Sequence, residues 1–233
     1  MQLSKRMKYL IADAISVGSC RLSQAVTKLQ SLEDGLPNGI KRCRYDQTVQ
    51  LNLRLGVDPK QADQLVRGSV VLPNGSGKVC RVVVFCSTEY EAVARQSGAD
   101  AVGAKDLAER VKLGWCDFDV ALATPDSMGI VGPLGRILGP RGLMPSPKAG
   151  TVTFDIANAV REYKAGKIEF RVDSGGNVHC VVGKLSFTHA SLVQNVEEVV
   201  RYLNSIRPAA AKGIYMRTAT LSASVSPGIK LLF

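Results

Sequence analysis

Several residues have the chemistry of a nucleotide or catalytic site but lack the spacing that such a site requires. Residues 75–78 read Gly-Ser-Gly-Lys, like part of a phosphate-binding loop, yet the G-x-x-x-x-G-K-[ST] spacing fails and Val79 follows the lysine. A turn between strands is the favoured interpretation. Residues 87–89 stand where a dinucleotide fold would carry G-x-G-x-x-G, and no G-x-S-x-G elbow occurs. We expect no catalytic residues, no enzymatic activity and no cofactor; the alternative is a nucleotide-dependent enzyme.

The cysteines and histidines do not have the spacing of a metal site. Zinc sites use closely spaced Cys and His pairs. Only His179 and His189 could join the cysteines as imidazole ligands, and no C-x-x-C pair occurs among Cys20, Cys43, Cys80, Cys86, Cys116 and Cys180. We therefore expect no bound metal and a reducing compartment, where free cysteines act as small apolar residues.

The positive charge is unevenly distributed along the chain. Residues 68–156 carry nine basic and nine acidic residues, whereas the rest carries 21 and 11, so the entire formal charge of +10 lies outside this middle segment. A basic surface favours a polyanionic partner through phosphate contacts and counterion release. The basic stretch of residues 1–10 lacks the long apolar segment of a secretory signal. No apolar run approaches the roughly 20 residues of a membrane span, so no membrane partner is expected.

Basic, aromatic and hydroxyl side chains recur at the ends of predicted strands outside the middle segment. In chain order they are Arg44, Tyr45, Lys164, Lys167, Arg171, His179, Ser222, Ser224 and Ser226. Cations position phosphates, while hydroxyl groups reach ribose 2′-hydroxyls. Each residue alone is also consistent with an ordinary solvated face. Together with the charge distribution, they predict RNA binding.

Amphipathic helices and alternating strands would position these residues at both ends of the chain. Helices are predicted over residues 4–17 and 23–32, with Ser23 as the N-cap of the second. A strand is predicted over residues 45–55, because apolar and polar residues alternate from Val49 onward, which gives one buried and one exposed face. The C-terminal part shows the same kinds of pattern, which predict helix 156–163, strand 167–172, hairpin turn 173–177, strand 178–182, helix 191–203 and a final strand 213–224.

The middle of the chain follows another pattern, in which buried strands alternate with helices. The predicted order is strand 79–86, helix 89–96, strand 101–103, helix 106–113 and strand 119–123. Such an order implies right-handed crossovers and a mostly parallel sheet. We therefore predict an α/β protein of two domains, namely a split α+β domain of residues 1–67 and 157–233, and an inserted three-layer, Rossmann-like α/β domain of residues 68–156. The chain crossings, near 66–69 and 150–155, would form a hinge.

Residues 129–151 are rich in Gly and Pro and have neither helix nor strand periodicity. Their many apolar residues need burial, so we interpret them as an ordered, packed loop rather than a linker. Within this loop, residues 132–151 read GPLGRILGPRGLMPSPKAGT. This sequence closely resembles the signature of large-subunit ribosomal protein one, the L-one stalk protein family. Similar segments follow the family order at residues 55–58, 66–68, 71–77, 164–166 and 211–215, and the bacterial and organellar branch is the closer likeness.

The resemblance implies a structural constituent of the large ribosomal subunit with two domains. Members bind rRNA to form the mobile stalk near the tRNA exit site and assist release of deacylated tRNA, and in bacteria they can repress translation of their own mRNA. The implied partners are therefore large-subunit rRNA, exit-site tRNA and the protein's own mRNA. The implied location is the ribosome of a bacterial cytoplasm, mitochondrion or plastid, and the free protein is expected to be a monomer.

The resemblance also assigns contact positions. The family's RNA contacts fall on Arg44, Tyr45, Gln47, Lys164, Lys167, Glu169, Arg171, His179, Ser222, Ser224, Val225 and Ser226. We expect secondary contacts to RNA or tRNA from Arg136, Arg141 and Lys148. The family commonly has Thr-Met-Gly at residues 224–226, and often Phe at 45 and Glu at 47. Because serine lacks the conformational freedom of glycine, the backbone at residue 226 is expected to approach RNA less closely.

Overall fold

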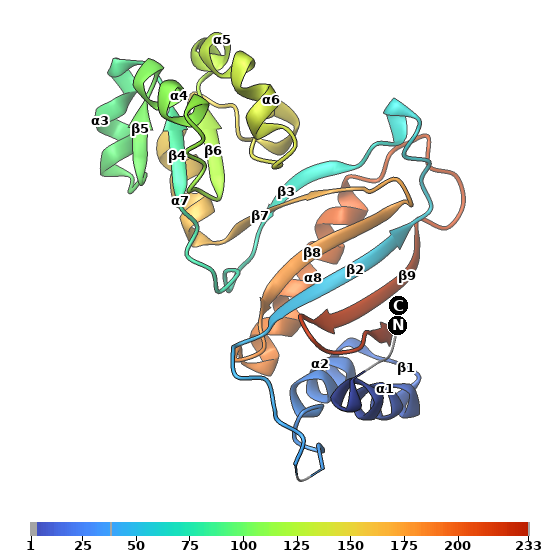
Figure 1. Ribbon diagram of the computed structural model, residues 1–233. Helices are drawn as coiled ribbons and strands as arrows, with labels where there is room; N and C mark the ends of the chain where they lie inside the picture. The colour runs from blue at the N-terminus through green and yellow to red at the C-terminus, as the bar shows by residue number, and fades with distance from the viewer. Residues whose placement is uncertain (1–3, 38, 233) are drawn as a thin grey trace. The chain divides into compact units, whose positions relative to one another are not determined.

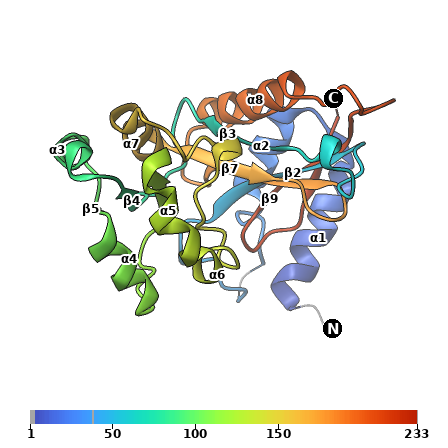
Figure 2. The ribbon, with the colours of Figure 1, turned by 90° about the horizontal axis from the view of Figure 1, so that it is seen from above.

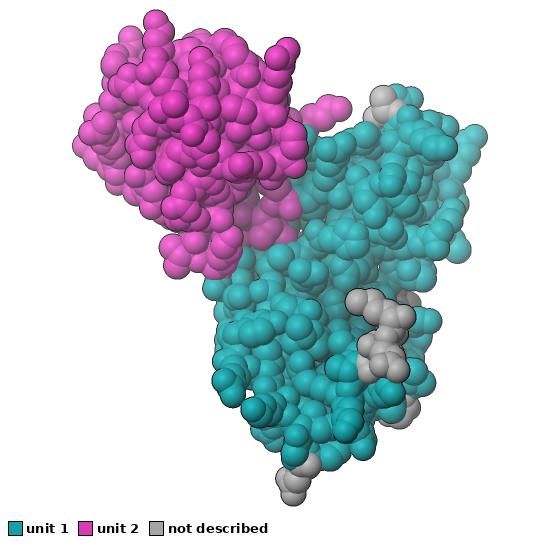
Figure 3. Space-filling view, viewed as in Figure 1, with its two compact units in different colours: residues 1–77, 170–233 teal, residues 78–169 magenta. Residues whose placement is uncertain are grey.

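The computed structural model describes residues 4–37 and 39–232. Contacts between Cα atoms divide the chain into two compact units, which Figure 3 colours separately. Unit 1 comprises residues 1–77 and 170–233, and unit 2 comprises residues 78–169. Both ends of the chain therefore contribute to unit 1, and a single continuous segment forms unit 2.

Unit 1 is built on a five-stranded sheet in the order β1-β10-β9-β2-β8, in which only β1 and β10 run parallel. Helices α2 and α8 contact each other and cover one side of this sheet (Figures 1 and 2). The elements of the unit are α1 (Lys5–Val17), β1 (Ser19–Cys20), α2 (Leu22–Ser31), β2 (Thr48–Leu55), the 3₁₀ helix η1 (Ala62–Gln64), β3 (Arg67–Val71), β8 (Asn177–Lys184), α8 (His189–Ser205), β9 (Met216–Ala223) and β10 (Ile229–Leu231).

The alternation in β2 explains why helices cover only one side of the sheet. Leu51 and Leu53 are buried, while Gln50 and Arg54 on the same strand are exposed. Burying a leucine side chain is worth about 1.5–3 kcal/mol, so the apolar side of β2 is held firmly under the helices. Slipping the strand by one residue would exchange the two faces, so this burial also fixes the register. The predicted buried and exposed faces of this strand are confirmed.

Helix α2 starts one residue earlier than predicted, and Ser23 is not its N-cap. The cap is Arg21, whose backbone N–H donates to the side-chain oxygen of Gln24 (3.4 Å). The Ser23 hydroxyl lies 3.2 Å from Nε2 of His189 at the start of α8. Ser23 therefore joins two helices that are distant in sequence, which local pattern could not reveal.

Unit 2 has three layers around a parallel sheet in the order β5-β4-β6. Side chains of α4, α5 and α6 pack on one face, and those of α3 and α7 pack on the other. Its elements are β4 (Val82–Phe85), α3 (Thr88–Gln96), β5 (Ala101–Gly103), α4 (Lys105–Lys112), β6 (Val120–Ala123), η2 (Pro125–Ser127), α5 (Met128–Val131), η3 (Gly132–Leu134), α6 (Gly135–Leu138), η4 (Pro147–Ala149) and α7 (Ile156–Ala165). The predicted parallel sheet and mixed α/β class are confirmed.

The boundary between the units falls within β7 (Lys167–Arg171), which forms a two-stranded sheet with β3. Among the described residues, no helix is both long and apolar enough to cross a lipid bilayer.

Residues 129–151 are packed, as expected, but much of the stretch is helical rather than a loop. Val131, Leu134 and Leu138 are fully buried, and they lie on one-turn helices. Helices this short are not stable by themselves and form here because tertiary burial holds them. The glycines and prolines of this stretch interrupt any helical periodicity in the sequence, so these helices were not predicted.

The final strand predicted over 213–224 starts later, at Met216, and another strand follows it. β10 was missed because its three residues are too few to show a period of two.

Candidate nucleic-acid interface

The side of the unit 1 sheet opposite α2 and α8 carries mainly polar side chains, and we call it the open face. Three rows cross β9, β2 and β8: Ser222–Gln50–Val181, Thr220–Asn52–His179 and Thr218–Arg54–Asn177. Lys230 on β10 extends the middle row. All five strands lie within the described residues, and their sequences contain no Asp or Glu. Such a face offers cations, hydroxyls and amides to a polyanion without a strand carboxylate to repel it.

Hydrogen bonds link three strands across the middle of the open face. Asn52 donates from Nδ2 to Oγ of Ser222 (3.1 Å), and its Oδ1 lies 2.8 Å from Nδ1 of His179. The other ring nitrogen of His179 lies 3.6 Å from Asp173 in the preceding turn. Two predicted contact residues, His179 and Ser222, are thus brought together by Asn52, which sequence reasoning did not select.

The start of β2 and the end of β9 meet at one end of this sheet, and we call that end the rim. It comprises Arg44, Tyr45, Thr48, Lys184 and residues 224–226. The Thr48 N–H donates to Oγ of Ser224 (3.1 Å), and Lys184 donates to the Thr48 hydroxyl (2.8 Å). The predicted contact residues 44–45 and 224–226, distant in sequence, therefore belong to one structural region.

Tyr45 presents an exposed aromatic ring at the rim, with 57% of its surface accessible. Desolvation raises the pKa of its hydroxyl, and the neighbouring Cys43 and Glu33 act in the same direction while Arg6 opposes them. A tyrosine hydroxyl is protonated at neutral pH even at its ordinary pKa of about 10, so it can donate a hydrogen bond. An exposed ring of this kind is also suited to stacking on a nucleobase.

Gln47 lies behind the rim rather than on it, which corrects its expected role as a direct contact. Only 2% of its surface is exposed. Its amide donates to Oε1 of Glu33 (2.7 Å) and its carbonyl oxygen accepts from the Val225 N–H (3.1 Å). Both ends of the side chain are therefore used within the protein.

Ser226 fits its position without the backbone freedom of glycine. No non-glycine residue in the described part of the chain has a positive φ. The Ser226 hydroxyl oxygen accepts from the Ala223 N–H (2.9 Å), so the side chain closes the turn that follows β9.

Three predicted contact residues lie together in unit 2. Lys164 pairs with Asp100 (2.6 Å) and Lys167 with Glu162 (2.7 Å). Glu169 accepts a hydrogen bond from the Tyr163 hydroxyl (2.9 Å). The Lys167 side chain is only 13% exposed and also lies over the Tyr163 ring, so its ammonium group is largely committed inside the protein.

The remaining predicted contacts, Arg171, Arg136, Arg141 and Lys148, are exposed. Arg171 is exposed at the end of β7, within unit 1. Arg136, Arg141 and Lys148 lie in the Gly- and Pro-rich stretch of unit 2, on α6, on the turn that follows it and on η4.

The predicted RNA contacts include only two members of the open face, His179 and Ser222. Its unselected polar members are Gln50, Asn52, Arg54, Asn177, Thr218, Thr220 and Lys230. For six of them the sequence did carry a signal, namely the alternation of polar and apolar residues within β2, β8 and β9. Every second residue of a strand points to the same face, so this alternation indicates which polar residues lie together. Lys230 had no such signal, since β10 is too short.

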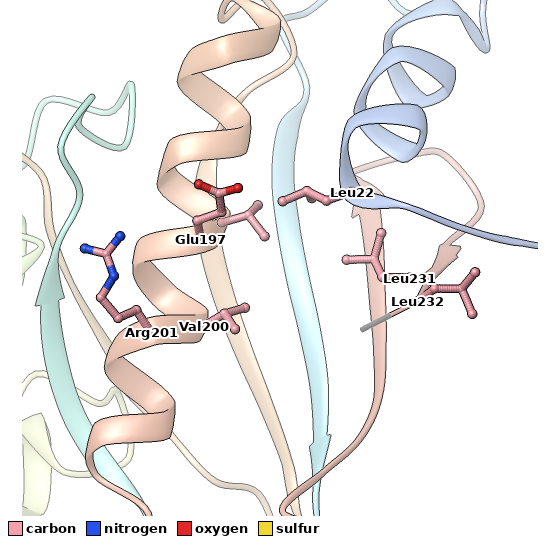
Figure 4. A pocket seen from close by; sticks show the side chains of 7 residues that line it. Leu22, Glu197, Val200, Arg201, Leu231 and Leu232 are labelled. Atoms are coloured by element: carbon pink, nitrogen blue, oxygen red, sulfur yellow. The ribbon is translucent and has the colours of Figure 1, made fainter.

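The helix side of unit 1 has a different character. A groove of about 330 Å³ lies there between α2, α8 and β10, lined by Leu22, Val196, Glu197, Val200, Arg201, Leu231 and Leu232 (Figure 4). Most of these side chains are apolar, unlike those of the open face. In the described part of the chain, no three His, Cys, Asp or Glu side chains are grouped so as to hold a metal ion.

Comparison with known families agrees with the polar, cationic character of the open face. Residues 38–227 match the Ribosomal protein L1p/L10e family. The match begins before the rim, ends after the turn that follows β9, and includes all of unit 2. Because it covers most of the sequence, the chain belongs to the Ribosomal protein L1p/L10e family, whose members are structural, rRNA-binding proteins of the large ribosomal subunit.

Proposed function

We propose that the open face and the rim of unit 1 are the surface through which this protein binds large-subunit rRNA. The observation that carries the proposal is a sheet face whose five strands contain no acidic residue. Unit 1 also holds 18 basic and nine acidic residues, whereas unit 2 holds 12 and 11. An excess of nine positive charges attracts the phosphate backbone, while the hydroxyl and amide groups suit ribose 2′-hydroxyls.

The contacts within this surface suggest a division of labour. Arg44 and Tyr45 would bind phosphate and base, and His179, Ser222, Ser224 and Val225 would contact ribose and backbone. Arg171 would add a further phosphate contact. Lys164 and Lys167 would contribute less, because a carboxylate already pairs with each ammonium group, and Glu169 would contribute less because its charge has the same sign as the phosphates.

The two units would act as domains with different tasks. We propose that unit 1 is the RNA-binding domain and that unit 2, nearly neutral, moves about the two chain crossings near residues 77 and 169. This movement would help the stalk to release deacylated tRNA, with Arg136, Arg141 and Lys148 as secondary contacts. We further propose that the protein represses translation of its own mRNA, that it belongs to a bacterial or organellar ribosome and that it is a monomer when free. These three points rest on the family resemblance.

A filter-binding titration tests the RNA surface. The full chain should bind an rRNA fragment of the stalk region much more tightly than an unrelated duplex of equal length, at several salt concentrations. Equal affinity for the two RNAs would contradict the proposal. Co-sedimentation of the native protein with large subunits would separate ribosome membership from a role as a repressor alone.

A further inference from the structure

Glu33, just beyond the end of α2, connects three segments that surround the rim. Its carboxylate pairs with the guanidinium of Arg6 on α1. Its Oε2 accepts from the Cys43 N–H (2.8 Å), and its Oε1 accepts from the Gln47 amide (2.7 Å). The Glu33 side chain is only 16% exposed, so these contacts are poorly screened by solvent.

Two of these contacts, those with Cys43 and Gln47, lead to predicted RNA contacts. The Cys43 N–H lies one residue before Arg44, so Glu33 fixes the backbone that carries Arg44 and Tyr45. Gln47 links Glu33 to the end of β9, because its side-chain oxygen accepts from the Val225 N–H (3.1 Å). The backbone carbonyl of Gln47 accepts from the Leu185 N–H (2.8 Å), which holds Gln47 in place. Glu33 is therefore linked to both halves of the rim without lying on its surface.

The hydrogen-bonding groups of Glu33 and Gln47 complement each other. An amide has both a donor and an acceptor, so Gln47 can serve the Glu33 carboxylate and the Val225 N–H together. A glutamate at position 47 would have acceptors only and would set two carboxylates in contact, which disfavours ionisation of both. A leucine at position 47 would remove the hydrogen bonds that Gln47 makes to the Glu33 carboxylate and to the Val225 N–H.

We propose that Glu33 is a positioning residue for RNA binding, which acts through Cys43 and Gln47 to hold the two halves of the rim in register. The proposal rests on the proposed RNA surface. It assigns a role in recognition to a carboxylate, a group that a phosphate backbone would otherwise repel.

A double-mutant cycle on the full chain tests the proposal. The variants are Glu33→Gln, Gln47→Glu and the combination of both, with Glu198→Gln as a matched control. Glu198 is a partly exposed glutamate that pairs with Arg201 on α8, on the helix side of the sheet. Affinity for the rRNA stalk fragment would be measured by filter binding, and hydrogen exchange would be followed at the Cys43 and Val225 amides.

Each single variant should weaken binding by about 5–30-fold, the effect of losing one or two buried hydrogen bonds. The combination should recover most of this loss, because a glutamine at 33 can donate to a glutamate at 47. Exchange should quicken at Cys43 in Glu33→Gln, where an NH2 group replaces one of the two acceptor oxygens. The Val225 amide should stay protected in Gln47→Glu, because the carboxylate still accepts from it, and the Leu51 amide in β2 should stay protected in both variants. Glu198→Gln should change affinity less than about twofold, since exposed ion pairs contribute little.

The outcomes separate the two proposals. If the unaltered protein prefers the stalk fragment no more than an unrelated duplex, the RNA surface itself is refuted. If it prefers the fragment and both single variants bind equally well, the positioning role of Glu33 is refuted. Faster exchange at Leu51 as well would indicate general destabilisation and would also overturn the proposal. If Glu33→Gln does not fold, Glu33→Asp, which keeps the charge, should fold and bind with an intermediate affinity.

Discussion

At the scale of single residues, hydrogen-bond partners distinguish side chains that are near one another in sequence. Arg44 and Gln47 are three residues apart, and the family resemblance assigns both to RNA contact. Arg44 is exposed, whereas Gln47 is buried with both ends bonded inside the protein. The first is suited to touching a phosphate, and the second to fixing the backbone beside it.

Arg44→Ala should weaken rRNA binding and lower the slope of log affinity against log salt. One lost phosphate contact changes that slope by about 0.7–0.9 units. Filter binding at four or more salt concentrations measures it. Arg201→Ala, an exposed arginine on α8, serves as the control and should leave the slope unchanged. Equal slopes for Arg44→Ala and the unaltered protein would remove Arg44 from the interface.

Asn52→Ala should weaken rRNA binding by about tenfold, although the family resemblance does not assign Asn52 as an RNA contact. It removes the hydrogen bonds that orient His179 and Ser222, each worth about 1 kcal/mol. Asn204→Ala, on an exposed position of α8, is the matched control. If both alanine variants bind like the unaltered protein, the middle row of the open face makes no contribution to binding.

At the scale of elements, tight approaches between backbone segments set where the strands end. Gly56 follows β2 directly, and its N–H donates to the Tyr215 carbonyl (2.6 Å) just before β9. A Cβ built on Gly56 would collide with the Ile214 carbonyl oxygen. Only glycine permits this approach, which brings the end of β2 against the start of β9.

Gly56→Ala should therefore destabilise the protein by about 1–3 kcal/mol, the usual cost of overpacking. Gly35→Ala is the control, since a Cβ there would meet no atom within 4 Å and its φ is not in the left-handed region. Denaturant unfolding followed by circular dichroism measures both. Indistinguishable midpoints for the two variants would show that the backbone can move aside without cost.

The turn before β8 should give unfolding a pH dependence. The Asn177 N–H, with further bonds from the Asn177 side chain, the Gly175 N–H and His179, holds the pKa of Asp173 at about 2. The ordinary value is about 4. Because the folded-state pKa is the lower one, the stabilisation is fully present above about pH 4 and is lost as the pH falls towards 2.

Asp173→Ala should consequently lower the thermal midpoint at pH 7, and the difference from the unaltered protein should shrink as the pH falls from about 4 to about 2. Calorimetry across this range measures it. Asp63→Ala, at an exposed residue of η1, should show no such trend. A difference that is constant with pH would mean that the Asp173 charge does not stabilise the turn.

At the scale of the whole molecule, charge is divided between the two units. Unit 1 carries nearly all of the positive excess, and unit 2 is close to neutral. Counterion release scales with the number of phosphates neutralised, so most of the binding free energy should come from unit 1.

Replacing residues 78–169 with a short Gly-Ser linker should therefore retain most of the affinity for the rRNA fragment. The salt dependence should also be little changed. A far-ultraviolet circular dichroism spectrum would first establish that the shortened chain folds. Loss of specific binding by a folded variant would show that unit 2, including Lys164 and Lys167, supplies essential contacts.

The sequence alone predicted the mixed α/β class, the alternating faces of β2, the parallel sheet of the middle segment and the family. These depend on local periodicity, on the order of elements and on a long contiguous motif, all of which can be read along the chain. The basic character outside the middle segment was equally visible, because charge is additive and needs no coordinates.

Only the tertiary structure decided which polar residues share a surface and which of them are free to bind. Asn52 joins His179 to Ser222, and Gln47 joins Glu33 to Val225, through contacts between residues far apart in sequence. The one-turn helices within residues 128–138 likewise exist only because their apolar residues are buried against other elements. Pairing across strands and burial are properties of the folded chain, so a local pattern could show which residues were polar but not which role each would take.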